Sequence, residues 1–249
     1  MSATVAGAGL WCQDVTRGFF ARAANTGFDW LCIDLQHSRI GMDDAFDFIS
    51  GLPAGAPPVA IRVAASDPAR IGSALDSGAA AVIVPSVSSA AEAARIVDAA
   101  FYPPIGSRSW GQYVAFTGGV ARSASDINDE TLCAVMIETI GGYREVEAIA
   151  AVPGVGMLFV GPYDLSLALG TTVQELLSDG VVLRGIADVA KRNGIAIGAY
   201  AGSPAAGRRF RELGYDCLAI ADDSYIIAGG AAAALEAFAP VIADSPASA

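Results

Sequence analysis

The sequence predicts an α/β fold in which eight parallel strands and their helices form a (β/α)8 TIM barrel, and three observations support it. Apolar runs alternate with helix-like segments along the whole chain. The runs are continuously apolar, as is typical of parallel strands that are covered on both faces. Eight such units in 249 residues match the usual size of this barrel. The predicted strands are residues 8–12, 30–35, 58–63, 80–85, 133–138, 157–161, 195–200 and 216–221.

Helix signals separate these strands. Ser, Asp or Pro stands near the start of the intervening segments, and Gly stands just past the end of several of them. Gly78, Gly194 and Gly214 fit helix C-caps. An open doubly wound sheet is the alternative, but Gly7-Ala8-Gly9 precedes the first strand, whereas a dinucleotide fingerprint would follow it. The clearest helical segments are residues 67–77, 89–100, 142–151 and 204–213.

The interval between the fourth and fifth strands is unusually long, at residues 101–131. It contains Tyr102-Pro103-Pro104-Ile105-Gly106-Ser107-Arg108, in which Pro and Gly favour a shaped loop over a helix. Loops of this length are uncommon unless they are functional. We therefore expect this loop to cover the C-terminal face of the barrel.

Composition excludes several classes of protein. A hydrophobic content of 53% allows a sizeable core, and a net charge of −11 argues against a nucleic-acid surface. The chain shows no signal peptide and no apolar run of the roughly 18 residues that a membrane span needs. Residues 1–243 are predicted to form one domain, and 244–249 a disordered tail. The widely spaced cysteines lack a zinc pattern and suit buried, reduced thiols in a cytoplasmic protein; they are Cys12, Cys32, Cys133 and Cys217.

Polar residues stand at the ends of several predicted strands. His37, the one histidine of the chain, follows the second strand, and Arg62 ends the third. Glu138 ends the fifth strand, and Asp164 closely follows the sixth. Because the C-terminal ends of parallel strands gather on one face, where active sites lie, these four side chains are expected to meet there.

The chemistry of these residues suggests a metal-assisted reaction. Glu138 and Asp164 suit a hard divalent ion such as Mg2+ or Mn2+, although each acid could instead simply cap the helix that follows it. His37 is the acid–base candidate, because an imidazole can accept or donate a proton in catalysis. Asp34 could orient it only if the strand has ended and turned, because residues i and i+3 of a strand point to opposite faces.

Two further features concern anions. The guanidinium of Arg62 requires an anionic partner, which could be a ligand or a protein carboxylate. The segment Gly161-Pro162-Tyr163-Asp164-Leu165-Ser166 reads as a loop entering a helix, where backbone N–H groups could hold a carboxylate.

The single lysine excludes one mechanism. Schiff-base aldolases need a lysine in the barrel core. Lys191 lies instead in a predicted helix end, where a cation stabilises the helix dipole. Any carbonyl chemistry in this chain should therefore be metal-assisted.

Taken together, these segments resemble the HpcH/HpaI family of metal-dependent pyruvate-type aldolases. The resemblance extends from about Gly9 to Ala239. It depends on four motifs in order, namely residues 28–37, Val84-Pro85 with the loop at 102–108, Met136-Ile137-Glu138-Thr139, and residues 161–166. It implies a (β/α)8 barrel, often a homohexamer (a trimer of dimers) with exchanged C-terminal helices, that uses Mg2+, Mn2+ or Co2+.

The resemblance also implies roles for individual residues. His37 matches the catalytic base, and Arg62 matches the arginine that stabilises an enolate. Glu138 and Asp164 match the metal ligands, and the backbone N–H at Tyr163 matches one that holds the pyruvate carboxylate. Asp76 matches an aspartate that makes the histidine more basic, yet barrel geometry places it near the far face, so it would act across a subunit contact.

The sequence differs from the family pattern at positions that bear on which aldehyde reacts with the 2-oxoacid. The chain has Gln36 before His37 where glutamate is common, and Met136 where a substrate-contacting glutamine is common. The function that follows is cleavage or formation of a C–C bond between the enolate of pyruvate, or of a close 2-oxoacid such as hydroxypyruvate, and an aldehyde. A synthase or ester lyase that uses the same enolate, and a barrel that binds a 2-oxoacid without catalysis, are the alternatives.

Overall fold

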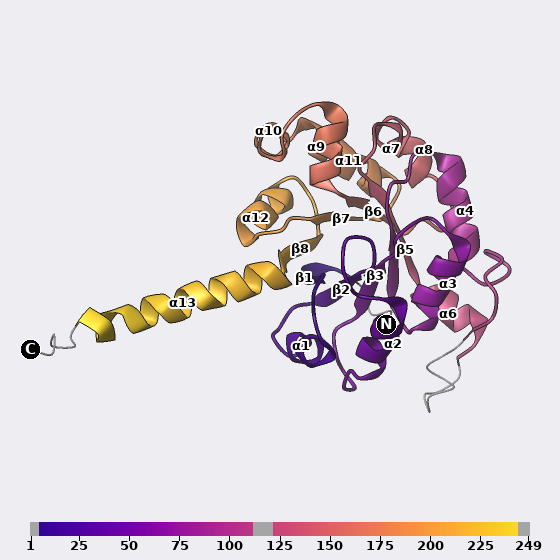
Figure 1. Cartoon of the computed structure of the whole chain (residues 1–249). Coiled ribbons are helices and arrows are strands. Elements are labelled where there is room, and N and C mark those ends of the chain that lie inside the picture. Colours follow the sequence, from indigo (N-terminus) through magenta and orange to yellow (C-terminus); the bar gives the residue numbers. More distant parts are fainter. Residues whose placement is uncertain (1–4, 112–121, 244–249) are drawn as a thin grey trace, which may run out of the picture.

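The structure is a closed barrel of eight parallel strands that follow one another in chain order (Figure 1). This computed structural model describes residues 5–111 and 122–243, so the predicted tail at 244–249 lies outside the described residues. β8 pairs with β1 and closes the barrel. The strands are β1 (Gly7–Cys12), β2 (Trp30–Asp34), β3 (Val59–Arg62), β4 (Ala81–Val84), β5 (Leu132–Ile137), β6 (Met157–Val160), β7 (Ala196–Tyr200) and β8 (Cys217–Asp222).

Each predicted strand is confirmed to within one residue at either end. Alternate side chains of a strand point to opposite faces, and both faces are buried here. In β2, Trp30 and Cys32 belong to the cluster that fills the barrel interior, whereas Leu31 and Ile33 belong to the layer between strands and helices. This double burial explains why the strands are continuously apolar.

Helices surround the barrel (Figure 1). Asp67, Ser89 and Ser203 cap the N-termini of α3, α4 and α12, as the sequence signals predict. The predicted helix at 142–151 is instead two short helices, α7 and α8, because the backbone leaves helical geometry at Glu145. The helices are α1 (Arg17–Ala23), α2 (Met42–Ser50), α3 (Pro68–Asp76), α4 (Ala90–Ala100), α6 (Ala124–Glu130), α7 (Ile140–Arg144), α8 (Val146–Ala150), α9 (Pro162–Leu169), α10 (Val173–Asp179), α11 (Val181–Arg192), α12 (Pro204–Glu212) and α13 (Asp223–Ala243).

The described part of the long interval at residues 101–131 lies at the opposite end of the barrel from the one we predicted. Its described part follows α4, and Arg108 contacts Asp76 at the end of α3. Arg108 also lines a cavity beside Pro58 and Ala80, which precede β3 and β4. A segment that leads from a helix into the next strand begins and ends at the N-terminal ends of the strands, so the prediction that the interval covers the C-terminal face is wrong for its described residues, 101–111 and 122–131. Residues 112–121 lie outside the described part, and 124–130 form α6.

The last helix, α13, projects away from the barrel (Figure 1). It is rich in alanine, and its side chains are exposed from Ser224 to Ala239. Leu235 is 70% exposed and Phe238 is 56% exposed. Over the described ranges, the structure contains no helix with both the length and the apolar character that membrane crossing requires.

Candidate active site

A cavity of about 260 Å³ opens at the C-terminal ends of the strands. It brings together residues from six different strand ends or the loops that follow them, as the strand-end argument predicts. Asp34 lies buried directly beneath it, whereas Asp76 is distant. The cavity is lined by Trp11, Gln13, His37, Arg62, Met136, Glu138, Gly161, Pro162, Tyr163, Asp164 and Tyr200.

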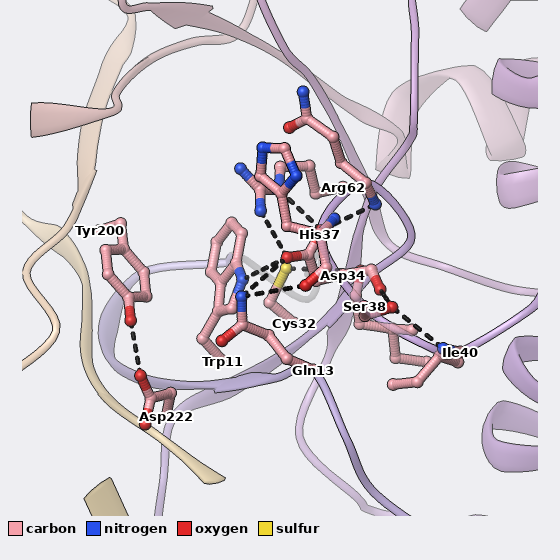
Figure 2. A network of polar contacts seen from close by, with 12 residues as sticks. Trp11, Gln13, Cys32, Asp34, His37, Ser38, Ile40, Arg62, Tyr200 and Asp222 are labelled. Carbon is pink, nitrogen blue, oxygen red and sulfur yellow. Dashed lines mark hydrogen bonds and ion pairs between the residues drawn. The ribbon is translucent and has the colours of Figure 1, made fainter. Parts of the chain in front are cut away.

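Arg62 and Asp34 form a buried ion pair below the cavity (Figure 2). Strand register places the two residues side by side in β2 and β3. Arg62 Nε donates to Asp34 Oδ1 at 2.8 Å, and Nη2 donates to Oδ2. The Arg62 guanidinium also lies 5.1 Å from the centre of the Trp11 ring. The anionic partner that Arg62 requires is therefore a protein carboxylate.

Asp34 is ionised because of these contacts. Burial by itself would raise its pKa, but the hydrogen bonds and charge of Arg62 hold the pKa below the usual value. Trp11 Nε1 and Gln13 Nε2 add donors to Oδ2 at 3.3 and 3.2 Å. The carboxylate thus organises the floor of the cavity.

The chain turns directly after Asp34, as a link to His37 requires. The backbone N–H groups of Gln36 and His37 donate to Asp34 Oδ1 at 2.9 and 3.3 Å. Asp34 therefore holds the backbone of His37, and no hydrogen bond joins the carboxylate to the imidazole. The His37 ring is exposed and borders the cavity. Its nitrogens have no hydrogen-bond partner within the described part of the chain, which leaves them available to a ligand or to water.

Glu138 has one satisfied and one unsatisfied oxygen. Its Oε1 accepts from the backbone N–H of Ser86 at 2.7 Å and from the Ser86 hydroxyl at 3.3 Å. Its Oε2 is buried and has no partner among the described residues. Burial raises the pKa of Glu138, and the nearby charge of Asp164 raises it further. A buried carboxylate oxygen without a donor is costly, so this atom is a candidate ligand for a cation.

Gly161 and Asp164 complete this side of the cavity. A Cβ at Gly161 would lie 2.3 Å from Glu138 Oε2, so only glycine leaves room for the carboxylate. Gly161 precedes α9, and Asp164 is exposed in the first turn of that helix. The backbone N–H groups of Tyr163 and Asp164 belong to the helix start, where amides lack intrahelical partners. Together with the buried Met136, they form a wall that could receive a carboxylate.

Asp76 is not brought to this cavity. It ends α3 at the N-terminal face of the barrel, where it accepts a hydrogen bond from Arg108. Arg108 is itself buried and stacks over Tyr102, and two of its nitrogens, Nε and Nη1, have no partner among residues 5–111 and 122–243. Within one chain, Asp76 and His37 therefore belong to opposite ends of the barrel.

Sequence reasoning missed four residues of the site. Trp11 and Gln13 come from the end of β1, Tyr200 ends β7, and Ser86 follows β4. The strand-end rule would have marked all four had it been applied to every strand. It would not have shown the role of Ser86, because that role depends on a backbone φ of 58° that aims its N–H at Glu138.

Comparisons with known proteins indicate the family of the chain. The family model described as HpcH/HpaI aldolase/citrate lyase matches residues 8–228. The 2-dehydro-3,6-dideoxy-6-sulfogluconate aldolase of Pseudomonas putida is 34% identical over 225 residues, which cover 86% of each chain. The hydroxypyruvate/pyruvate aldolase of Pseudomonas aeruginosa is 35% identical over 233 residues, which cover 88% of this chain and 83% of the relative. The crystal structure of an HpcH/HpaI aldolase/citrate lyase family protein from Burkholderia cenocepacia J2315 is similar with a TM-score of 0.83, 30% identity and 93% coverage of both chains.

Proposed function

This chain belongs to the HpcH/HpaI aldolase/citrate lyase family and is a carbon–carbon lyase; we propose that it is an aldolase in which a divalent metal ion assists the reaction of a 2-oxoacid enolate with an aldehyde. The 2-oxoacid is pyruvate or a close analogue such as hydroxypyruvate. The observation that carries the proposal is the unpartnered, buried Oε2 of Glu138, which shares one cavity with Asp164, Arg62 and His37.

Glu138 and Asp164 would hold the ion, which we expect to be Mg2+, Mn2+ or Co2+. The donor set fits, because hard cations prefer carboxylate oxygens. No cluster of three or more His, Cys, Asp and Glu side chains suited to a metal occurs in residues 5–111 and 122–243. The remaining ligands would therefore be substrate oxygens and water. When bound, such an ion acts as a Lewis acid that polarises the keto group of the substrate.

Other groups of the protein would bind the substrate, stabilise the enolate and transfer the proton. The N–H groups at the start of α9, including that of Tyr163, would bind the substrate carboxylate, and Met136 and Gly161 would shape the space around it. Arg62, oriented by Asp34, would offset negative charge on the enolate oxygen. His37 would transfer the proton of the 4-hydroxyl through a water molecule. Asp76 would act on the histidine of a neighbouring subunit.

Metal dependence is tested most directly without any aldehyde. We expect the protein to exchange the methyl protons of pyruvate into deuterated water only when a divalent ion is present, and chelation should abolish the exchange. Borohydride in the presence of pyruvate should leave the protein unmodified, because Lys191 is exposed at the end of α11 and does not line the cavity. Proton NMR and intact-mass spectrometry measure the two results. A borohydride-trapped adduct on Lys191 would contradict the proposal.

Gly161→Ala should weaken metal binding by about 10–100-fold, as changes beside metal ligands commonly do. The added methyl group would occupy the space that Glu138 Oε2 needs. Titration calorimetry with Mn2+ measures the change. Gly185→Ala is the matched control, because its Cβ would meet open space on α11. Equal affinities in the two variants would argue against Glu138 as a ligand.

We also propose that the protein is a cytoplasmic homo-oligomer, a hexamer built as a trimer of dimers. The four cysteines are buried and unpaired, which suits a reducing compartment. The apolar side chains of α13 have no partner within the described part of the chain beyond the helix start, and a second subunit would cover them.

Light scattering should therefore show a multimer at micromolar concentration. Leu235→Glu with Phe238→Glu should reduce its mass, because both side chains are exposed on α13. Val181→Glu is the control, since Val181 is a similarly exposed apolar residue at the start of α11. A monomeric wild-type protein would refute the assembly.

A further inference from the structure

We propose that Gln13 and Tyr200 are specificity residues that act as hydrogen-bond acceptors and select an uncharged aldehyde carrying a hydroxyl group. Both residues line the cavity at the ends of β1 and β7. This inference rests on the proposed aldolase function and names the chemistry of its aldehyde.

Tyr200 presents an oxygen whose only proton is already used. Its hydroxyl donates to Asp222 Oδ2 at 2.6 Å (Figure 2). Asp222 is itself held in place, because its Oδ1 accepts from the backbone N–H of Tyr225 at 2.7 Å. A phenol has one proton and two lone pairs, so toward the cavity the Tyr200 oxygen can only accept. Burial and then the hydrogen bond to Asp222 raise the pKa of Tyr200 well above its usual value, so the phenol stays protonated.

The Tyr200 ring has little freedom to turn away from this position. Trp11 packs edge-on against it, with ring centres 5.4 Å apart, and Tyr163 lies on another side at 6.2 Å. Trp11 is in turn fixed by its hydrogen bond to Asp34. The acceptor is therefore preorganised within the wall of the cavity.

Gln13 also presents an acceptor. Its amide nitrogen donates to Asp34 Oδ2 at 3.2 Å and to the backbone oxygen of His37 at 3.4 Å. Both partners can only accept, so the NH2 group must face them and the amide oxygen must face away (Figure 2). Asp223 fixes the residue further by accepting from the Gln13 backbone N–H at 3.0 Å. No described residue donates to the Gln13 amide oxygen or to the Tyr200 hydroxyl oxygen.

Charge and size restrict the ligand further. Glu138 and Asp164 would be occupied by the metal ion, and the guanidinium of Arg62 is already paired with Asp34. An aldehyde that carries a carboxylate would therefore find no unpaired guanidinium or ammonium group among the described residues of the cavity, and the Tyr200 and Gln13 oxygens can only accept. Cavities for drug-sized ligands have volumes of about 300–1,000 Å³, so the 260 Å³ measured here suits a small substrate. A short hydroxyaldehyde meets both conditions, since its hydroxyl can donate to Tyr200 or Gln13.

The test compares glycolaldehyde with acetaldehyde, which differ by one hydroxyl group. The readout is the ratio of their kcat/KM values in addition to pyruvate, measured in the wild type and in variants, so that the intrinsic reactivity of the aldehydes cancels. Tyr200→Phe removes one acceptor and should lower the ratio by about tenfold. Gln13→Met, of similar size, should lower it too and provides a second measurement if Tyr200→Phe folds poorly.

Tyr215→Phe is the matched control, because it deletes a buried phenol hydroxyl whose partner is Leu183 on the outer side of the barrel. Its ratio should equal that of the wild type. A ratio in Tyr200→Phe and Gln13→Met within about twofold of the wild type would overturn the inference. Pyruvate proton exchange in the wild type separates the two hypotheses: its absence would refute the aldolase function, whereas exchange with unchanged ratios would refute only the selection of a hydroxyl.

Discussion

Asp164→Ala and Glu138→Gln should each lose divalent-ion binding and, with it, all pyruvate chemistry. The two carboxylates are the proposed ligands of the hard ion, and Asp164→Ala removes one of them. In Glu138→Gln the amide oxygen would stay on the backbone N–H of Ser86, so the NH2 group, which cannot bind a cation, would take the place of Oε2. Titration calorimetry with Mn2+ and the deuterium exchange of pyruvate measure the two losses. Glu138→Gln should stay folded, because burial raises the pKa of Glu138 and a neutral amide removes the desolvation cost of the buried charge.

His37→Ala is the contrasting variant. It should bind the metal ion and pyruvate as the wild type does, yet cleave aldol substrates far more slowly, because the imidazole is proposed to transfer a proton and not to bind the ion. If His37→Ala abolished metal binding, His37 would be a ligand, and both the base and the metal site would be wrongly assigned.

Arg62→Met should lose rate and stability together while it keeps metal binding. Loss of a positive charge beside a developing enolate typically costs about 3 kcal/mol of transition-state stabilisation, or roughly 100-fold in rate. The same change leaves Asp34 buried without its cation, which typically lowers the free energy of unfolding by about 3–5 kcal/mol. Urea denaturation and steady-state kinetics measure the two effects.

The double variant Asp34→Asn with Arg62→Met separates them. It should recover much of the stability, because no unpaired charge stays buried, but none of the rate. Recovery of the rate as well would show that Arg62 acts only through packing.

The ion pair between Asp34 and Arg62 should also make the free energy of unfolding depend on pH in the acid range. The folded pKa of Asp34 lies below the ordinary aspartate value, so the unfolded chain takes up this proton more readily. The ionised Asp34 therefore stabilises the folded state fully above the ordinary aspartate pKa, and this stabilisation is lost as the pH falls through the lower pKa of the folded protein. Denaturation curves of the double variant should lack this acid-dependent component.

The sequence by itself determined the barrel and most of the cavity. Strand positions depend on local apolar runs that are buried on both faces, and helix starts depend on local caps such as Asp67 and Ser89. Parallel strands then bring their C-terminal ends to one face whatever their partners are. For this reason, the sequence alone could predict that four polar residues share one cavity, namely His37, Arg62, Glu138 and Asp164.

Only the tertiary structure decided which polar groups pair. Strand register joins Asp34 to Arg62, and the neighbouring strands β7 and β8 bring Tyr200 to Asp222. The backbone geometry of Ser86 determines which oxygen of Glu138 stays open. These contacts join residues far apart in the chain, and hydrogen bonds depend on tenths of an ångström, whereas a sequence pattern reports only local preference and the face on which a residue lies.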